Sequence, residues 1–306
     1  MARPAEEVPA SEADVDSRMM ARPVKTVVDA LFHAPPAWHG RPLYVTRGGS
    51  QTFGEARRDM LLAGGWLARE HGIGPGHRVC LCLPKGPLAA SVILGTMAAG
   101  ASYVPLEFHG PMYRQTAILD QVEPHLLVTT PAVARRFAAA RPGATSCPVV
   151  TIEENGFPAA QPLVRPVDVD GGAPAVIFFT SGTTGTPKGI VASRRNMAET
   201  VARSLDVLSL TADDRLLFHP PLHYSGSITL FEPLYAGCSS FIMSDQEVLF
   251  PDVVAGIIEK HGITVWQGAA SFLRALVEGG NLERRQLASV RFFDFFGERL
   301  PVAIVE

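Results

Sequence analysis

The chain has 306 residues, a formal net charge of −3, and a composition that is 47% hydrophobic and 19% charged. Such a chain is typical of a globular protein long enough to build two cores. It has no basic stripe, so nucleic acid is excluded as an expected partner. No stretch has the length and apolar character of a membrane span, and the acidic N-terminus does not have the pattern of a secretory signal.

The four cysteines lack any spacing typical of a metal site; they are Cys80, Cys82, Cys147 and Cys238. We expect free, buried thiols, which would suit a reducing, cytoplasmic location. Residues 1–22 carry several acidic side chains and no apolar periodicity. This segment therefore predicts a disordered leader.

From residue 23 the hydrophobic pattern alternates between helix-like and strand-like segments. In the first half we expect helices over 24–32, 54–71, 88–99, 113–122 and 131–140, and strands over 43–46, 51–53, 78–83, 102–106, 125–129 and 148–152. Gly48 and Gly49 predict the turn of a hairpin between the first two strands. Residues 153–173 are rich in Pro, Gly and Asp, which indicates a linker or long surface loop.

The second half continues the alternation. We expect strands over 175–180, 215–219, 239–243, 263–267 and 290–296, and helices over 194–205, 227–236, 252–261 and 271–278. Arg194 and Arg195 indicate a solvated helix start, and Asn196 suits its first turn. Strands and helices that alternate with short turns predict an α/β protein with mostly parallel, doubly wound sheets. We expect two subdomains, residues 23–170 and residues 171–306.

The strand over 175–180 runs into a loop in which hydroxyls, glycines and one lysine are concentrated. The candidate ligand-binding residues of this loop are Thr180, Ser181, Gly182, Thr183, Thr184, Gly185 and Lys188. Glycines let backbone N–H groups approach a ligand closely, and successive N–H groups in such a turn form an anion-binding concavity. Hydroxyls and a lysine add donors for phosphate oxygens. The loop therefore predicts a polyphosphate site.

The P-loop of nucleoside triphosphatases is the nearest alternative. That motif requires Gly-Lys-Ser/Thr followed by a helix. Here Pro187 precedes the lysine, and Gly189 and an apolar run follow it. The loop therefore joins two expected extended segments, and the P-loop is excluded.

The loop resembles the Thr-Ser-Gly-Thr-Thr-Gly-x-Pro-Lys-Gly signature of adenylate-forming enzymes, which include acyl- and aryl-CoA synthetases, luciferases and adenylation domains of non-ribosomal peptide synthetases. Further segments that resemble this family are 72–79, 97–107, 114–129, 261–264 and 289–292. The resemblance runs from about Val24 to the last residue. It implies ATP and Mg²⁺ as cofactors, with Thr180–Gly185 and Lys188 on the β- and γ-phosphates, and CoA or phosphopantetheine as the acyl acceptor.

Gly297 and Glu298 resemble the family segment that lines the adenine and acyl pocket, with Phe296 in place of its first glycine. Three family features have no counterpart before Glu306: the Tyr-Gly-x-Thr-Glu segment whose glutamate helps to hold magnesium, the aspartate that holds the ribose, and the lid lysine. We therefore expect a truncated N-terminal domain of two doubly wound subdomains, with no metal ligand of its own. A separate C-terminal half is a candidate partner.

Residues 219–237 carry the second informative stretch. Leu222–Gly226 resembles the Phe-His-x-x-Gly pattern of acyl- and aryl-CoA synthetases, which implies that His223 orients or gates the acyl carboxylate and that Ser225 borders the acyl group. A histidine that caps a strand end is the structural alternative for His223, and a structural role is favoured for His219. In amino-acid-activating domains an aspartate pairs with the substrate's ammonium group, and alignment places Tyr224 there. Burying that cation without a carboxylate is costly, which argues against an α-amino acid substrate.

Three functions stay open. The His223 pattern favours an acyl- or aryl-CoA ligase that activates a small carboxylic acid. Residues 103–107 and 114–129 resemble the peptide-synthetase adenylation domains more closely, for which a carrier protein would be the partner. The third possibility is a non-catalytic remnant or interaction module, because the C-terminal catalytic segments are not found.

Overall fold

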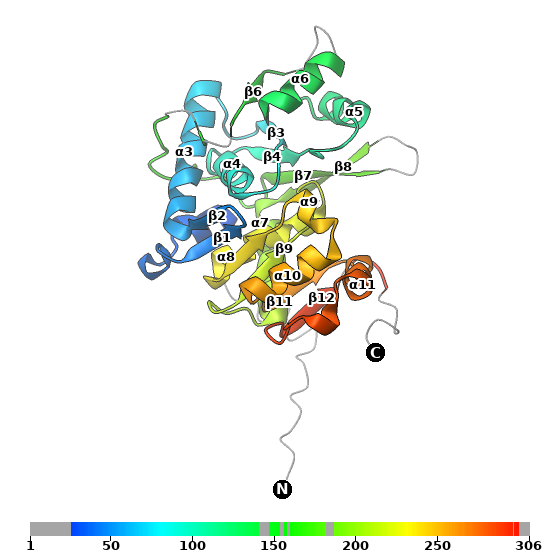
Figure 1. Ribbon diagram of the computed structural model, residues 1–306. Coiled ribbons are helices and arrows are strands. Elements are labelled where there is room, and N and C mark those ends of the chain that lie inside the picture. The colour runs from blue at the N-terminus through cyan, green and yellow to red at the C-terminus, as the bar shows by residue number, and fades with distance from the viewer. Residues whose placement is uncertain are drawn as a thin grey trace.

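The computed structural model describes residues 26–140, 147–153, 156–157, 160–181, 187–295 and 297–299. These residues form two six-stranded, mostly parallel sheets with helices packed around them, as the sequence predicted. Figure 1 shows one sheet in the upper half of the view and the other in the lower half. Cys80, Cys82, Cys147 and Cys238 are all free and buried, which confirms that expectation.

The upper sheet, here called sheet B, has the strand order β6-β5-β3-β4-β7-β8. Its strands are β3 (Arg78–Cys82), β4 (Ser102–Pro105), β5 (Leu126–Thr129), β6 (Val149–Thr151), β7 (Pro174–Ser181) and β8 (Pro187–Ser193). All neighbours are parallel except β7 and β8, which form an antiparallel hairpin. The predicted phosphate loop therefore joins two extended segments.

The lower sheet, here called sheet A, has the order β12-β11-β9-β10-β1-β2. Its strands are β1 (Pro42–Thr46), β2 (Gly49–Thr52), β9 (Arg215–Phe218), β10 (Ser239–Ile242), β11 (Val265–Gly268) and β12 (Phe292–Phe295). Only β1 and β2 are antiparallel, as the hairpin around Gly48 and Gly49 predicted.

Each sheet includes a hairpin that comes from the other half of the chain. The β1–β2 hairpin comes from the first half of the chain but pairs with β10, whereas the β7–β8 hairpin comes from the second half but pairs with β4. Residue 170, the expected boundary between subdomains, therefore does not separate the two sheets. Local patterns identify strands, but the pairing partner depends on contacts between distant segments.

The expected helices occur in the predicted order, and α9 is a short helix that the sequence did not predict. The helices are α2 (Val27–Phe32), α3 (Phe53–His71), α4 (Pro87–Ala98), α5 (Met112–Val122), α6 (Pro131–Ala140), α7 (Arg194–Leu208), α8 (Glu232–Ala236), α9 (Asp245–Val248), α10 (Pro251–His261) and α11 (Ala270–Gly279). Helix α4 is almost wholly buried and lies against α3, where a Cβ on Gly95 would come within 2.4 Å of the Ala63 Cβ. Among the described residues we find no helix with the length and apolar character that a bilayer crossing requires.

Three local expectations concern the helix over 227–236 and the first residues of α7. The expected helix over 227–236 is a 3₁₀ helix, η2 (Ser225–Phe231), followed by the short α8, because Pro233 lies in the first turn of α8 and has no N–H group. The start of α7 has the capping box of Ser193 and Asn196, which confirms the early-turn position of Asn196. The solvated start was wrong for Arg194, which is 5% exposed, whereas Arg195 is exposed.

Candidate functional site

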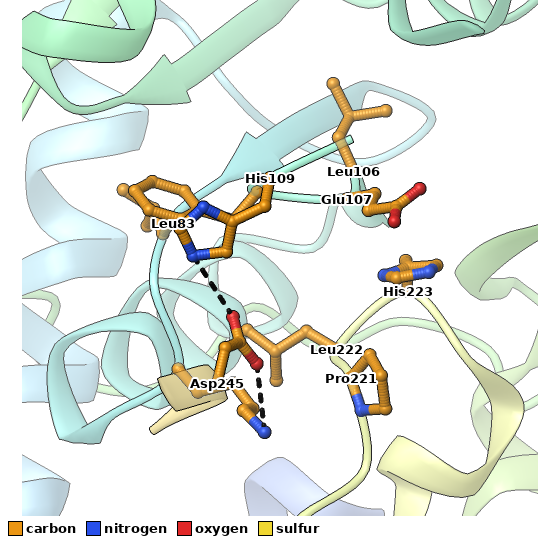
Figure 2. Close-up of a pocket in the computed structure, with 10 residues that line it drawn as sticks. Leu83, Leu106, Glu107, His109, Pro221, Leu222, His223 and Asp245 are labelled. Atoms are coloured by element: carbon orange, nitrogen blue, oxygen red, sulfur yellow. Dashed lines mark ion pairs between the residues drawn. The ribbon is translucent and has the colours of Figure 1, made fainter. Parts of the chain in front are cut away.

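A cavity of about 120 Å³ lies where strands of both sheets end. Its lining comes from the segments that follow β3 and β4 of sheet B and β9 and β10 of sheet A: Leu83, Lys85, Leu106, Glu107, Phe108, His109, Pro221, Leu222, His223 and Asp245. Figure 2 shows these side chains gathered around one space. Ligands of open α/β sheets bind at the carboxyl ends of parallel strands, so this is the expected place for a site.

Lys85 joins the two sheets at this cavity. Its side chain is 3% exposed, its Nζ lies 3.0 Å from Asp245 Oδ1, and it donates a 2.7 Å hydrogen bond to the carbonyl oxygen of His219. Burial lowers the pKa of Lys85, and the Asp245 carboxylate opposes that shift. His109 approaches the other Asp245 oxygen at 3.7 Å (Figure 2). The Lys85–Asp245 ion pair holds the turn after β3 against the ends of β9 and β10.

His223 lies on the opposite side of this space. Figure 2 shows the Glu107 carboxylate next to the His223 ring. Burial lowers the pKa of His223, and Glu107 opposes that shift more than any other group does. A neutral imidazole can both accept and donate a hydrogen bond. His223 can therefore orient a ligand group or accept its proton.

Ser225 and Tyr224 do not line the cavity with His223. Ser225 is exposed at the start of η2, and Tyr224 is 57% exposed with its ring 4.5 Å from that of His223. Of the two acyl-site candidates, His223 and Ser225, the structure places only His223 in the cavity wall.

The described residues on either side of the phosphate loop lie at the carboxyl edge of sheet B, the edge at which the cavity lies. Thr180 pairs with Lys188 across the β7–β8 hairpin, and both side chains are exposed. Strands β4 and β7 are parallel, with Tyr103 opposite Val176, so Glu107 and Thr180 lie at the same distance along the two strands. The backbone of Ser181 pairs with Pro187, while Gly182, Thr183, Thr184 and Gly185 lie outside the described residues.

Gly297 and Glu298 follow β12 at the carboxyl edge of sheet A. Gly297 has a φ of +89°, a backbone conformation that side chains disfavour. The Glu298 carboxylate accepts a 2.7 Å hydrogen bond from the backbone N–H of Ser271, in the first turn of α11, which lowers the pKa of Glu298. Sequence analysis placed Glu298 near adenine and missed this contact; Phe296 lies outside the described residues.

His219 is buried beneath the site rather than open to it. Its ring stacks on Phe272 at 4.1 Å, and its Nδ1 accepts a 3.3 Å hydrogen bond from the Trp266 indole. Burial lowers the pKa of His219 to about 3, with a smaller contribution from Lys85. This neutral, packed histidine fits the structural role favoured for it.

The two expected cofactors of this site are ATP and Mg²⁺. Within the described ranges, no group of three or more His, Cys, Asp or Glu side chains could form a metal site from protein ligands alone. Beside a nucleotide, Mg²⁺ is usually held by one or two carboxylates together with the phosphates. For ATP, the hydroxyl of Thr180 and the ammonium of Lys188 are donors of the kind that phosphate oxygens require. The described residues thus offer donors for phosphate oxygens but no cluster of three or more metal ligands.

Comparisons with known proteins agree with this architecture. The family described as AMP-binding enzyme matches residues 31–306. A dimodular nonribosomal peptide synthase of Bacillus subtilis (strain 168) is 29% identical over 245 residues, which are 78% of this chain and 10% of that protein. An L-proline--[L-prolyl-carrier protein] ligase of Streptomyces coelicolor is 30% identical over 253 residues, 76% of this chain and 47% of that protein.

Solved structures give the same result. The non-ribosomal peptide synthetase FmoA3 superposes with a TM-score of 0.80 at 26% identity, over 93% of this chain and 30% of that one. The chain thus spans less than half the length of each of these relatives. Because the matching family covers residues 31–306, the chain belongs to the family of AMP-binding enzymes.

Proposed function

We propose that this chain serves the activation of a carboxylic acid by ATP. The acid's carboxylate attacks the α-phosphorus, pyrophosphate leaves, and an acyl-adenylate forms. A thiol, from CoA or from the phosphopantetheine of a carrier protein, then takes the acyl group. One observation carries this proposal: the strands that flank the phosphate loop end at the same edge of sheet B as the cavity that holds His223.

The roles of individual residues follow from that arrangement. Lys188 and the hydroxyls of Thr180, Ser181, Thr183 and Thr184 would hold the β- and γ-phosphates, because an ammonium group and hydroxyls next to a glycine-rich turn are donors for phosphate oxygens. His223 would orient the acid's carboxylate as a neutral hydrogen-bonding group. Gly297 and Glu298 would border the adenine, and Ser225 the outer part of the acyl group.

The substrate and the acceptor are the finer parts of the proposal. Tyr224 stands where the amino-acid-activating pattern has an aspartate, which supports an acid without an α-ammonium group. The His223 pattern supports CoA as the acceptor. The similarity to a peptide synthase and to a prolyl-carrier protein ligase supports a carrier protein as the second candidate. Four free, buried thiols support a reducing compartment, and we place the protein in the cytoplasm on that ground.

The test is ATP–pyrophosphate exchange on the purified chain with a panel of fatty, aryl and amino acids. We expect exchange with one acid class, and a loss of about 10²-fold or more in Lys188→Ala, because a donor to the reacting phosphates is removed. Lys260→Ala is the matched control, since Lys260 is exposed at the end of α10. No exchange from a folded sample would refute self-sufficient adenylation and favour a non-catalytic module or a need for a separate C-terminal half.

A further inference from the structure

A second and larger cavity, of about 310 Å³, lies at the opposite edge of sheet B. Its wall is formed by α2, by residues 165–169 and by Arg194, the first residue of α7. Arg194 directly follows Ser193, which pairs with Pro174 at the start of β7, and its Nη2 donates a 3.1 Å hydrogen bond to the carbonyl oxygen of Ala101, just before β4. The cavity therefore lies where β4 and β7 begin, a strand's length from the His223 cavity.

Arg194 is a buried cation that has no ion-pair partner among the described residues. It is 5% exposed, and within the part of the chain that the structure describes its Nε has no hydrogen-bond partner and its Nη2 donates to the neutral Ala101 carbonyl. No carboxylate of the described residues lies within ion-pair distance, although Asp29 acts on it from further away. A buried and uncompensated charge is costly, and a guanidinium binds carboxylates through two parallel N–H groups. Both facts point to a carboxylate ligand.

The rest of the wall carries charges of both signs. Arg165 adds a second cation, while Asp29 and Asp168 supply two carboxylates, so the four charged groups sum to zero. One Asp29 oxygen accepts a 2.7 Å hydrogen bond from the Thr26 hydroxyl. A purely anionic ligand would gain from the arginines and be repelled by the aspartates, whereas a ligand with both charges complements the whole wall. The cavity volume is in the range of small-molecule sites.

We propose that this cavity binds a small zwitterion, such as a free α-amino acid, with its carboxylate on Arg194 and Arg165 and its ammonium group on Asp29 and Asp168. The site lies at the other edge of the sheet from the proposed adenylation site, so it goes beyond that function and does not depend on it. The proposal is for binding alone and includes no reaction at this site.

The test is isothermal titration calorimetry of the full chain, without ATP, with glycine and L-alanine as probes and with acetate and ethylammonium as single-charge controls. We expect the zwitterions to bind at least tenfold more tightly than either control. Arg194→Gln should weaken zwitterion binding at least tenfold, while Arg195→Gln, which changes the exposed neighbour, should leave it unchanged. His223→Ala should also leave it unchanged, which separates this site from the proposed adenylation site.

Two exposed positions keep the test decisive if Arg194→Gln does not fold. Arg165 and Asp168 are both exposed, so Arg165→Gln and Asp168→Asn are expected to fold and to weaken zwitterion binding several-fold each. The proposal is overturned if neither zwitterion binds at millimolar concentration, if acetate binds as tightly as glycine, or if the Arg165 and Asp168 variants bind as the unaltered chain does.

Discussion

Sheet B has one buried cation at each edge, and the two are held differently. At the carboxyl edge, Lys85 has a carboxylate partner at 3.0 Å and a carbonyl acceptor at 2.7 Å. At the amino edge, Arg194 has one carbonyl acceptor and an Nε without a partner. Burial lowers the pKa of both groups. Burial alone therefore does not define a cation's role: the paired lysine acts as a clamp between the sheets, whereas the arginine, unpaired among the described residues, is suited to a ligand.

The largest expected effect is at the clamp. Asp245→Ala should lower the free energy of unfolding by about 3 kcal/mol, because it leaves the buried Lys85 charge uncompensated. Lys85→Met should cost less, since the Asp245 side chain is 34% exposed and regains water. Urea unfolding at pH 7 measures both, with Asp213→Ala at an exposed position as the control. An equal loss from the two substitutions would show that the clamp acts through packing rather than charge.

The next largest effect is a loss of stability in acid that comes from His219, next to the clamp. The pKa of His219 is lowered from 6.5 to about 3, so its contribution to stability is present above pH 6.5 and is lost as the pH falls toward 3. Between pH 7 and pH 5 the expected loss is about 2 kcal/mol. Glu232 acts with the opposite sign, because burial raises the pKa of its carboxyl to about 7 and protonation then stabilises the fold.

The His219→Gln variant separates these two contributions. Gln can still accept the Trp266 N–H bond but does not titrate, so this variant should lose about 2 kcal/mol less than the unaltered chain between pH 7 and pH 5. Urea unfolding at the two pH values is the measurement. Identical pH dependence of the two proteins would mean that His219 is not held neutral by its burial.

The sequence predicted the strands of sheet B far better than the charged contacts at its ends. Alternating apolar runs identified β3, β4 and β7, and the loop composition predicted the strands around residues 182–186, because these signals are local. Which hairpin joins which sheet could not be read, since β1 pairs with β10 through distant contacts. The same holds for Lys85 and Asp245, which no spacing connects. A usable signal was present nearby: Ser244 and Glu247 have the capping-box spacing that starts α9 at Asp245.

Within the candidate site, the structure locates the predicted residues, while their roles toward a ligand stay predictions. His223 lines the cavity, and its neighbour Glu107 was noted only as part of a family-like segment. Arg194 was interpreted, together with Arg195, as part of a solvated helix start. The structure shows it buried, with α2 and residues 165–169 beside it in the cavity wall.

Substitution of Arg194, at the amino edge of sheet B, should not lower the free energy of unfolding as substitution at the clamp does. Arg194→Met replaces a buried cation that lacks an ion-pair partner among the described residues with an apolar side chain of similar length. The free energy of unfolding without ligand should therefore be unchanged or rise by up to about 1 kcal/mol. The lost donor to Ala101 limits the gain. Urea unfolding beside Lys85→Met is the measurement. A loss as large as that of Lys85→Met would mean that Arg194 is as fully compensated as the lysine and would remove the contrast between the edges.

The smallest effect on stability is expected at Lys188, because this side chain is exposed on the β7–β8 hairpin. Lys188→Ala should change the free energy of unfolding by less than about 0.5 kcal/mol. With ATP at ten times its Kd, the unaltered chain should gain about 1.4 kcal/mol, and the variant should lose most of that gain. Lys260→Ala should keep it. A gain that survives Lys188→Ala would assign nucleotide binding to other groups, whereas its loss without a change in basal stability would separate a binding lysine from the structural lysine at residue 85.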